Sequence, residues 1–181
     1  MKSYRDVIRF WFEEHTSDDW FGGKVEFDEK LRAQFFETHA PVARGEAWAW
    51  RETPEGRVAE IVVLDQFSRQ FYRGDARAFA SDTMALALAQ ELVESGLDTG
   101  LDHDKRMFAY MPYMHSESLV VHDEAVRLFT GLGDEGVLKF EMMHREVVER
   151  FGRFPMRNAA LGRTSTVEEI AYIAGREGKM F

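Results

Sequence analysis

Residues 53–71 read TPEGRVAEIVVLDQFSRQF, and this stretch decides the fold class. Thr53 followed by Pro54 is typical of a helix start, because threonine caps the first turn and proline is preformed for it. In the predicted helix, Arg57 to Phe71, apolar residues cover most of the circumference. A helix that is apolar nearly all round is usually central and buried. The sequence therefore predicts a helical core.

Helix signals continue on both sides of this stretch. Tyr4, Val7, Ile8 and Trp11 follow the i, i+3, i+4, i+7 spacing of one apolar helix face. No convincing alternating strand pattern occurs, so the sequence predicts an all-α fold of about eight helices without a sheet. Short turns between helix pairs also fit stacked helical hairpins. The further predicted helices span about 28–44, 76–95, 104–111, 117–130 and 135–151, and a last one opens at the capping-box pattern Thr166–Glu169.

Composition limits the classes of protein that remain. With 181 residues and 45% apolar residues, the chain is predicted to form a single domain over 1–181. A net charge of −9 argues against nucleic acid and anionic membranes as partners. The absence of cysteine excludes disulfides and thiolate metal sites. No signal peptide and no apolar run of about 18 residues is present, so we expect a cytoplasmic protein.

Two motifs have a structural interpretation that outweighs the functional one. Residues 131–136, GLGDEG, fit the dinucleotide pattern G-x-G-x-x-G, but a helix precedes them and Asp134 and Glu135 would repel phosphates. We interpret them as a helix–helix turn capped by Asp134. Glu141 and His144 form one Glu-x-x-His pair, whereas helical di-iron sites need two. No metal and no cofactor are therefore predicted, and His144 is interpreted as a hydrogen-bonded core residue.

Charged residues gather in two places. Asp65, Gln66, Arg69 and Arg73 lie near the end of the buried helix, where charges must be paired, so they form either an internal polar network or a pocket wall. Residues 150–163, RFGRFPMRNAALGR, hold four arginines and no acid, which is +4 in a chain of −9. Fixed arginine forks bind carboxylate or phosphate. These arginines either bind an anion or attach the loop to acidic helices.

Four strings carry a family resemblance: Phe10-Trp11-Phe12, LDQFSRQFYRG at 64–74, YMPYMHSES at 110–118 and RFGRFPMRNAALGRTST at 150–166. In this order they resemble the uncharacterised bacterial family DUF924 over essentially the whole chain. The resemblance implies a tetratricopeptide-like stack of helical hairpins and no particular activity. Ser68, Gln70 and Met156 depart from the usual proline, asparagine and histidine, and the last departure weakens an acid–base role for the loop.

The resembling strings bring together one set of polar residues, which we predict to line a single pocket if their segments meet. The leading hypothesis is a helical binding module whose pocket takes a small anion or a peptide carboxylate. One alternative is a structural or scaffold domain that binds a protein partner, and another is an enzyme with His115 or His144 as general base. The predicted ligand-binding residues are Asp65, Gln66, Arg69, Arg73, His115, Glu117, Arg153, Arg157, Asn158 and Arg163.

Overall fold

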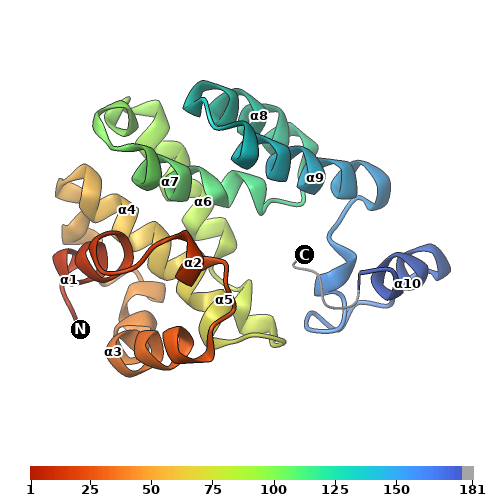
Figure 1. Ribbon diagram of the computed structural model, residues 1–181, viewed down its shortest axis with the longest axis horizontal. Helices are drawn as coiled ribbons and strands as arrows, with labels where there is room; N and C mark the ends of the chain where they lie inside the picture. The colour runs from red at the N-terminus through yellow and green to blue at the C-terminus, as the bar shows by residue number, and fades with distance from the viewer. Residues whose placement is uncertain (177–181) are drawn as a thin grey trace. The chain divides into compact units, whose positions relative to one another are not determined.

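Every regular element of the computed structural model, which describes residues 1–176, is helical (Figure 1). The predicted all-α class is confirmed, and no strand occurs in residues 1–176. Because α4 (Pro54–Val62) and α5 (Ser68–Phe71) are the two ends of one rod, joined by the π-helical segment η3 (Val63–Phe67), the α-helical segments amount to about nine helices. The tetratricopeptide-like stacking stays a prediction.

The chain divides into two compact units. Unit 1 comprises residues 1–73 and 77–112, and unit 2 comprises residues 74–76 and 113–181, of which the structure describes those up to 176. Each unit has its own packing and is described by itself below. A single domain over residues 1–181 stays a prediction.

Helix α4 is the centre of unit 1, as its all-round apolar character predicts. Helices α1 and α6 both pack against it, and α3 packs against η3 and α5. The Thr53 hydroxyl accepts a hydrogen bond from the Gly56 N–H at 3.0 Å, which confirms the predicted cap. The other elements of this unit are α1 (Tyr4–Ile8), η1 (Arg9–Glu13, π), α2 (Ser17–Trp20), α3 (Val25–Ala43), η2 (Trp48–Glu52, 3₁₀), α6 (Asp82–Glu94), η5 (Leu97–Gly100, 3₁₀) and most of α7 (His103–Met114).

An aromatic cluster around Trp11 fills the core of unit 1. Trp11 is fully buried, and its ring centroid lies between 5.4 and 6.1 Å from those of Trp20, Phe27, Phe67 and Phe108. Aromatic pairs at such distances contribute beyond their buried area. The Trp11–Phe67 contact joins the two π-helical segments, η1 and η3.

Unit 2 is built on the hairpin of α8 (Leu119–Leu132) and α9 (Glu135–Phe151), which pack together. Gly133 ends α8 in the left-handed region at φ 79°, and the Asp134 carboxylate accepts hydrogen bonds from the N–H groups of Gly136 and Val137. The predicted helix–helix turn at residues 131–136 is therefore confirmed. Beyond α9 follow η6 (Pro155–Arg157, 3₁₀) and α10 (Val167–Ala174), which contact each other.

Two predicted helices differ from the structure in their details. The helix predicted from Arg57 already begins at Pro54, and it widens into a π-helix at residues 63–67. The helix predicted for 76–95 begins as an α-helix only at Asp82, because residues 76–78 form the separate 3₁₀ turn η4 (Ala76–Ala78). Among residues 1–176, no helix is both long and apolar enough to span a membrane.

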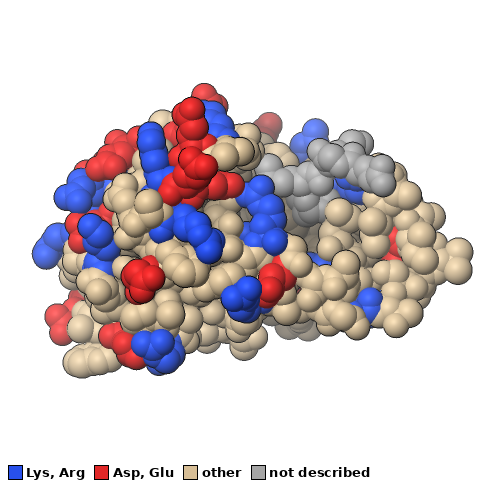
Figure 2. All heavy atoms as spheres, turned by 90° about the horizontal axis from the view of Figure 1, so that it is seen from below, with Lys and Arg blue, Asp and Glu red and all other residues tan. Residues whose placement is uncertain are grey.

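Charges of both signs alternate over the surface. Figure 2 shows one face of the molecule, on which acidic and basic side chains are interspersed. Many of them form pairs, such as Arg44 with Glu46 and Lys24 with Asp19. This face therefore offers no extended surface of a single sign for a polyanion.

Candidate functional site

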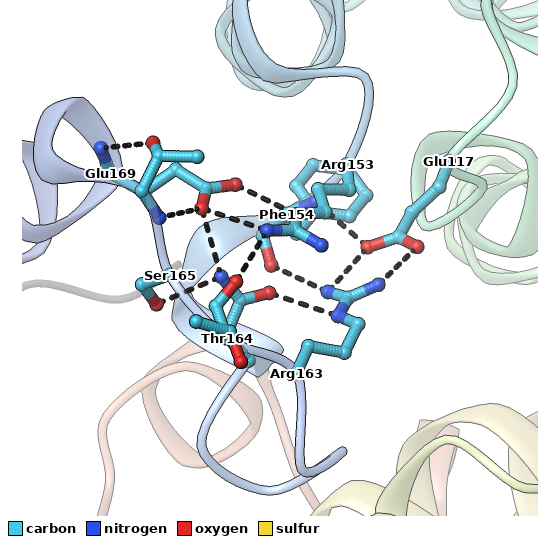
Figure 3. Close-up of polar contacts among 9 residues, drawn as sticks. Glu117, Arg153, Phe154, Arg163, Thr164, Ser165 and Glu169 are labelled. Atoms are coloured by element: carbon cyan, nitrogen blue, oxygen red, sulfur yellow. Dashed lines mark hydrogen bonds and ion pairs between the residues drawn. The ribbon is translucent and has the colours of Figure 1, made fainter.

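The ten predicted site residues divide between the two units. His115, Glu117, Arg153, Arg157, Asn158 and Arg163 belong to unit 2, whereas Asp65, Gln66, Arg69 and Arg73 belong to unit 1. In unit 2, the turn before α8, the loop after α9 and the start of α10 come together (Figure 3). The arginine-rich loop is held there by two carboxylates.

The first carboxylate is that of Glu169, on the first turn of α10. Arg153 donates from Nε to Oε1 at 2.7 Å and from Nη2 to Oε2 at 2.8 Å. Oε2 also accepts from the Thr166 N–H at 2.8 Å and from the Asn158 amide at 3.3 Å. These bonds, those from Arg153 above all and then that from Thr166, lower the pKa of Glu169 from an ordinary 4.5 to about 2. Arg153 further donates to the Thr164 carbonyl at 2.9 Å.

The second carboxylate is that of Glu117, in the turn before α8. Arg163 donates from Nη1 and Nη2 to its two oxygens at 2.7 and 3.0 Å, and the Phe154 N–H donates to it at 2.7 Å. Burial alone would raise the pKa of Glu117, but the bonds from Arg163 lower it. Arg163 Nε donates to the Asn158 side-chain oxygen at 2.9 Å. Asn158, which is 1% exposed, thus connects the two arginine–carboxylate pairs.

Arg157 and His115 meet through a backbone group. Arg157 Nη2 donates to the His115 carbonyl at 2.9 Å, and its guanidinium carbon lies 4.4 Å from the centroid of the Phe154 ring. The His115 ring lies 6.1 Å from that of His144, centroid to centroid. Phe154 is buried, and its ring also lies 5.7 Å from that of His144. This phenylalanine is therefore surrounded by the basic side chains of unit 2.

His144 is not suited to act as a general base near neutral pH. It is 7% exposed, and its Nδ1 donates to the Phe140 carbonyl at 2.7 Å. Burial, followed by the charges of neighbouring basic groups, lowers the pKa of His144 from 6.5 to about 3. A general base is most effective with a pKa near the working pH. The hydrogen-bonded core role predicted for this histidine agrees with these contacts.

The four predicted residues of unit 1 form an ionic network of their own. Arg69 donates to both oxygens of Asp82 at 2.9 Å, and its Nη1 also lies 2.9 Å from the Asp65 carboxylate. Asp65 is 1% exposed and accepts a hydrogen bond from the Gln66 amide. Arg73 pairs with Asp28 at 3.2 Å on the surface. Of the two interpretations of these residues, the contacts agree with the internal network.

Comparison with known proteins places the chain in a family. The model of "Bacterial protein of unknown function (DUF924)" matches residues 7–177. The chain belongs to the DUF924 family. A solved structure, "Structure of Protein of Unknown Function ATU0120 from Agrobacterium tumefaciens", is 35% identical, with a TM-score of 0.90 over 95% of this chain and 97% of that one. Among curated proteins, none matches the chain.

The strings that carry the DUF924 resemblance thus lie at structurally defined places. Phe10-Trp11-Phe12 falls within η1, and LDQFSRQFYRG covers the end of η3 and α5. Ser68, which replaces the usual proline, donates its hydroxyl to the Leu64 carbonyl at 2.6 Å and lies 2.7 Å from His39 Nε2. The string 150–166 supplies the arginines and Asn158 of the unit 2 network. The strings therefore include core positions as well as polar ones.

One buried pair in this DUF924 protein was missed from the sequence. His122 on α8 and Glu141 on α9 are both fully buried, and Nδ1 lies 2.7 Å from Oε1. His122 Nε2 donates to the Ser116 carbonyl at 2.9 Å, since a carbonyl can only accept. Burial raises the pKa of Glu141, which favours a neutral pair with the proton on the carboxyl group. His122 falls on the apolar face of α8 beside Ala125 and Phe129, and this periodicity was the available signal.

No metal site emerges from these residues. Among residues 1–176, no group of three or more His, Asp or Glu side chains is placed to hold a metal ion. Glu141 Oε2 is buried and has no hydrogen-bond partner, but the nearest basic group to its other oxygen is His122, whose two nitrogens are both engaged. The pair therefore connects α8, α9 and the turn before α8.

Proposed function

We propose that this protein acts by binding another protein chain, and that α10 is its contact surface. The observation that carries the proposal is the orientation of α10. Val167 and Ile170 are 85% and 57% exposed, and Ala171 and Ala174 are exposed as well, whereas Glu169 is 2% exposed. A surface helix normally buries its apolar stripe. An exposed apolar stripe that is flanked by charged residues is typical of a protein-binding site.

The occupied state of the arginines supports this choice over a ligand pocket. Arg153 and Arg163 each bind a carboxylate of the same unit through two hydrogen bonds, and Arg150 pairs with Glu168. An external anion would have to displace these internal carboxylates. The arginines therefore serve to fix the loop and α10 in place, and α10 is presented on a rigid support.

The proposal is tested by site-specific photo-crosslinking in bacterial cells. A benzophenone amino acid is placed at Ile170, and the matched control carries it at Val120 on α8, which is 80% exposed. We expect a discrete crosslinked product from position 170 and none from position 120. Absence of a product at 170, or the same products at both positions, would contradict a contact surface on α10.

Anion binding is a second candidate, and one observation favours it. Arg153, Asn158 and the Thr166 N–H already bind a carboxylate, that of Glu169. If α10 moved away, these donors would be available to a small anion or a peptide carboxylate. Thermal unfolding with phosphate, nucleotides, dicarboxylates and short peptides tests this function. A ligand at a hundred times its dissociation constant adds about 2.7 kcal/mol, which is about 5–10 °C for a chain of this size.

The two candidates give opposite results in that experiment. Under anion binding, a ligand raises the midpoint of the wild type, and Glu169→Gln strengthens the response because the internal competitor is weakened. Arg153→Ala abolishes it. Under protein binding through α10, no member of the panel shifts the wild-type midpoint.

A further inference from the structure

The stripe on α10 has a self-complementary order of side chains. Val167, Ile170, Ala171 and Ala174 follow the i, i+3, i+4, i+7 spacing, so they form one line along the outer side of the helix. Two large residues come first along the chain and two small ones follow. When a second α10 lies antiparallel to the first, Val167 faces Ala174 of the second copy and Ile170 faces its Ala171. Each large side chain then meets a small one.

From this order we propose that the partner bound by α10 is a second copy of this chain. The twofold axis of the pair passes between Ile170 and Ala171, which makes the contact isologous: the same patch is used on both copies. Most soluble oligomers are homo-oligomers of closed symmetry, and twofold dimers are the commonest. The inference rests on the proposed function, because it names the partner of the same surface.

Charge at the two ends of α10 is complementary in this arrangement. The helix begins with Glu168, whose side chain is 62% exposed and paired with Arg150. It is followed by Arg176, whose guanidinium lies over the Tyr172 ring. The antiparallel pair places the acidic start of one helix beside the basic end of the other and aligns the two helix dipoles favourably. Neither of the existing contacts has to break.

The support of α10 suits it to this role. Its one buried side chain is Glu169, which Arg153, Asn158 and the Thr166 N–H hold by directional hydrogen bonds. On the inner side Tyr172 also packs against Phe151, with ring centroids 5.0 Å apart. The inner side thus fixes the rotation of α10 about its axis, so the apolar stripe stays turned outward and preorganised for a partner.

The contact is small, and this sets the conditions of the test. One eight-residue helix offers much less than the about 800 Å² per partner that a standard interface buries. We therefore expect a monomer–dimer equilibrium that is seen only over a wide range of concentration, from about 10 µM to about 1 mM. Sedimentation equilibrium of the full chain measures it. The average mass is expected to rise from 21.0 kDa towards twice that value.

Two matched variants assign the dimer to α10. Val167 and Val120 are valines in the first turn of a helix, at 85% and 80% exposure. Val167→Asp is expected to keep the chain monomeric over the whole range, and Val120→Asp to leave the wild-type equilibrium unchanged. Circular dichroism confirms that both variants are folded. A wild type that stays monomeric, or a dimer that survives Val167→Asp, would overturn the proposal.

Introduced cysteines test the antiparallel register, since the chain has no cysteine of its own. A mixture of Val167→Cys and Ala174→Cys is expected to form a mixed disulfide under mild oxidation faster than either variant alone. Faster coupling of Val167→Cys with itself would overturn the antiparallel arrangement. If position 170 crosslinks in cells to a different protein while the purified chain stays monomeric, the second copy is excluded and the proposed function stands. If neither occurs, both fail.

Discussion

Arg153 and Glu169 bind each other through two parallel hydrogen bonds of 2.7 and 2.8 Å, and this one pair attaches α10 to the arginine-rich loop. A bidentate arginine–carboxylate pair fixes direction as well as distance. In most surface helices, buried apolar side chains would serve this purpose. Here a carboxylate does so, and the attachment therefore depends on the charge of Glu169.

The attachment of α10 is expected to weaken at acid pH. The pKa of Glu169 lies at about 2 in the folded protein and at an ordinary 4.5 in the unfolded chain. The stabilisation is therefore complete above about pH 5 and is lost as the pH falls towards 2. Hydrogen exchange of residues 167–174 is expected to accelerate over this window. Glu169→Gln should show fast exchange already at pH 7, and an unchanged pH profile in that variant would contradict the role of the carboxylate.

His144 is expected to destabilise the fold over a different pH window. Its pKa is 6.5 when unfolded and about 3 when folded, so between these values only the unfolded chain binds the proton. Stability should therefore fall as the pH is lowered from about 6.5 to 3. NMR titration of the His144 ring should show a neutral imidazole down to pH 5. A ring that titrates between pH 6 and 7 would contradict this prediction, and His144→Gln is the control that removes this part of the pH dependence.

The Glu141 side chain is expected to tolerate an amide but not truncation. In a neutral pair the protonated carboxyl donates to His122 Nδ1, and a glutamine amide can donate in the same way. We expect Glu141→Gln to change the free energy of unfolding by less than about 1 kcal/mol, and Glu141→Ala to cost about 2–4 kcal/mol, because it leaves a buried polar group and a cavity. Urea unfolding measures both. A large loss in Glu141→Gln would indicate an ion pair instead.

Removal of Arg51 is expected to leave a buried charge in unit 1. Glu60 is fully buried, and its two oxygens accept from Arg51 Nε and Nη2 at 2.7 and 2.8 Å. Arg51→Ala should destabilise unit 1 by about 2–4 kcal/mol, because an unpaired buried carboxylate is costly. Tryptophan fluorescence during urea unfolding reports on this unit, which holds all four tryptophans. The double variant Arg51→Ala, Glu60→Met should recover most of the loss, and a double variant no more stable than Arg51→Ala would contradict the explanation.

Helix ends that are encoded by local hydrogen bonds were predicted well from the sequence. The caps at Thr53, Asp134 and Thr166 depend on residues within three positions, and all three occur in the structure. The π-helical segment Val63–Phe67 was not predicted. A change of helix type depends on packing with distant segments, here the Trp11–Phe67 contact, and local propensity does not record it.

The residues of the candidate site were predicted better than their partners. The unit 2 residues do come together, but the sequence left open whether Arg153 and Arg163 face a ligand or an internal carboxylate. Glu169 and Glu117 are 16 and 46 positions away from these arginines along the chain, so only the fold decides the pairing. The outward orientation of the apolar residues of α10 was likewise beyond reach. Periodicity defines a stripe but not the side of the helix that meets the core.

The π-helical segment in the middle of the central rod has a consequence for insertions and deletions. One residue advances an α-helix by about 100°, so losing a single residue from 63–67 would restore regular winding and rotate everything that follows. Arg69 would then turn away from Asp82, and Ser68 from His39. The rod can therefore exchange one side chain for another far more readily than it can change its length by one.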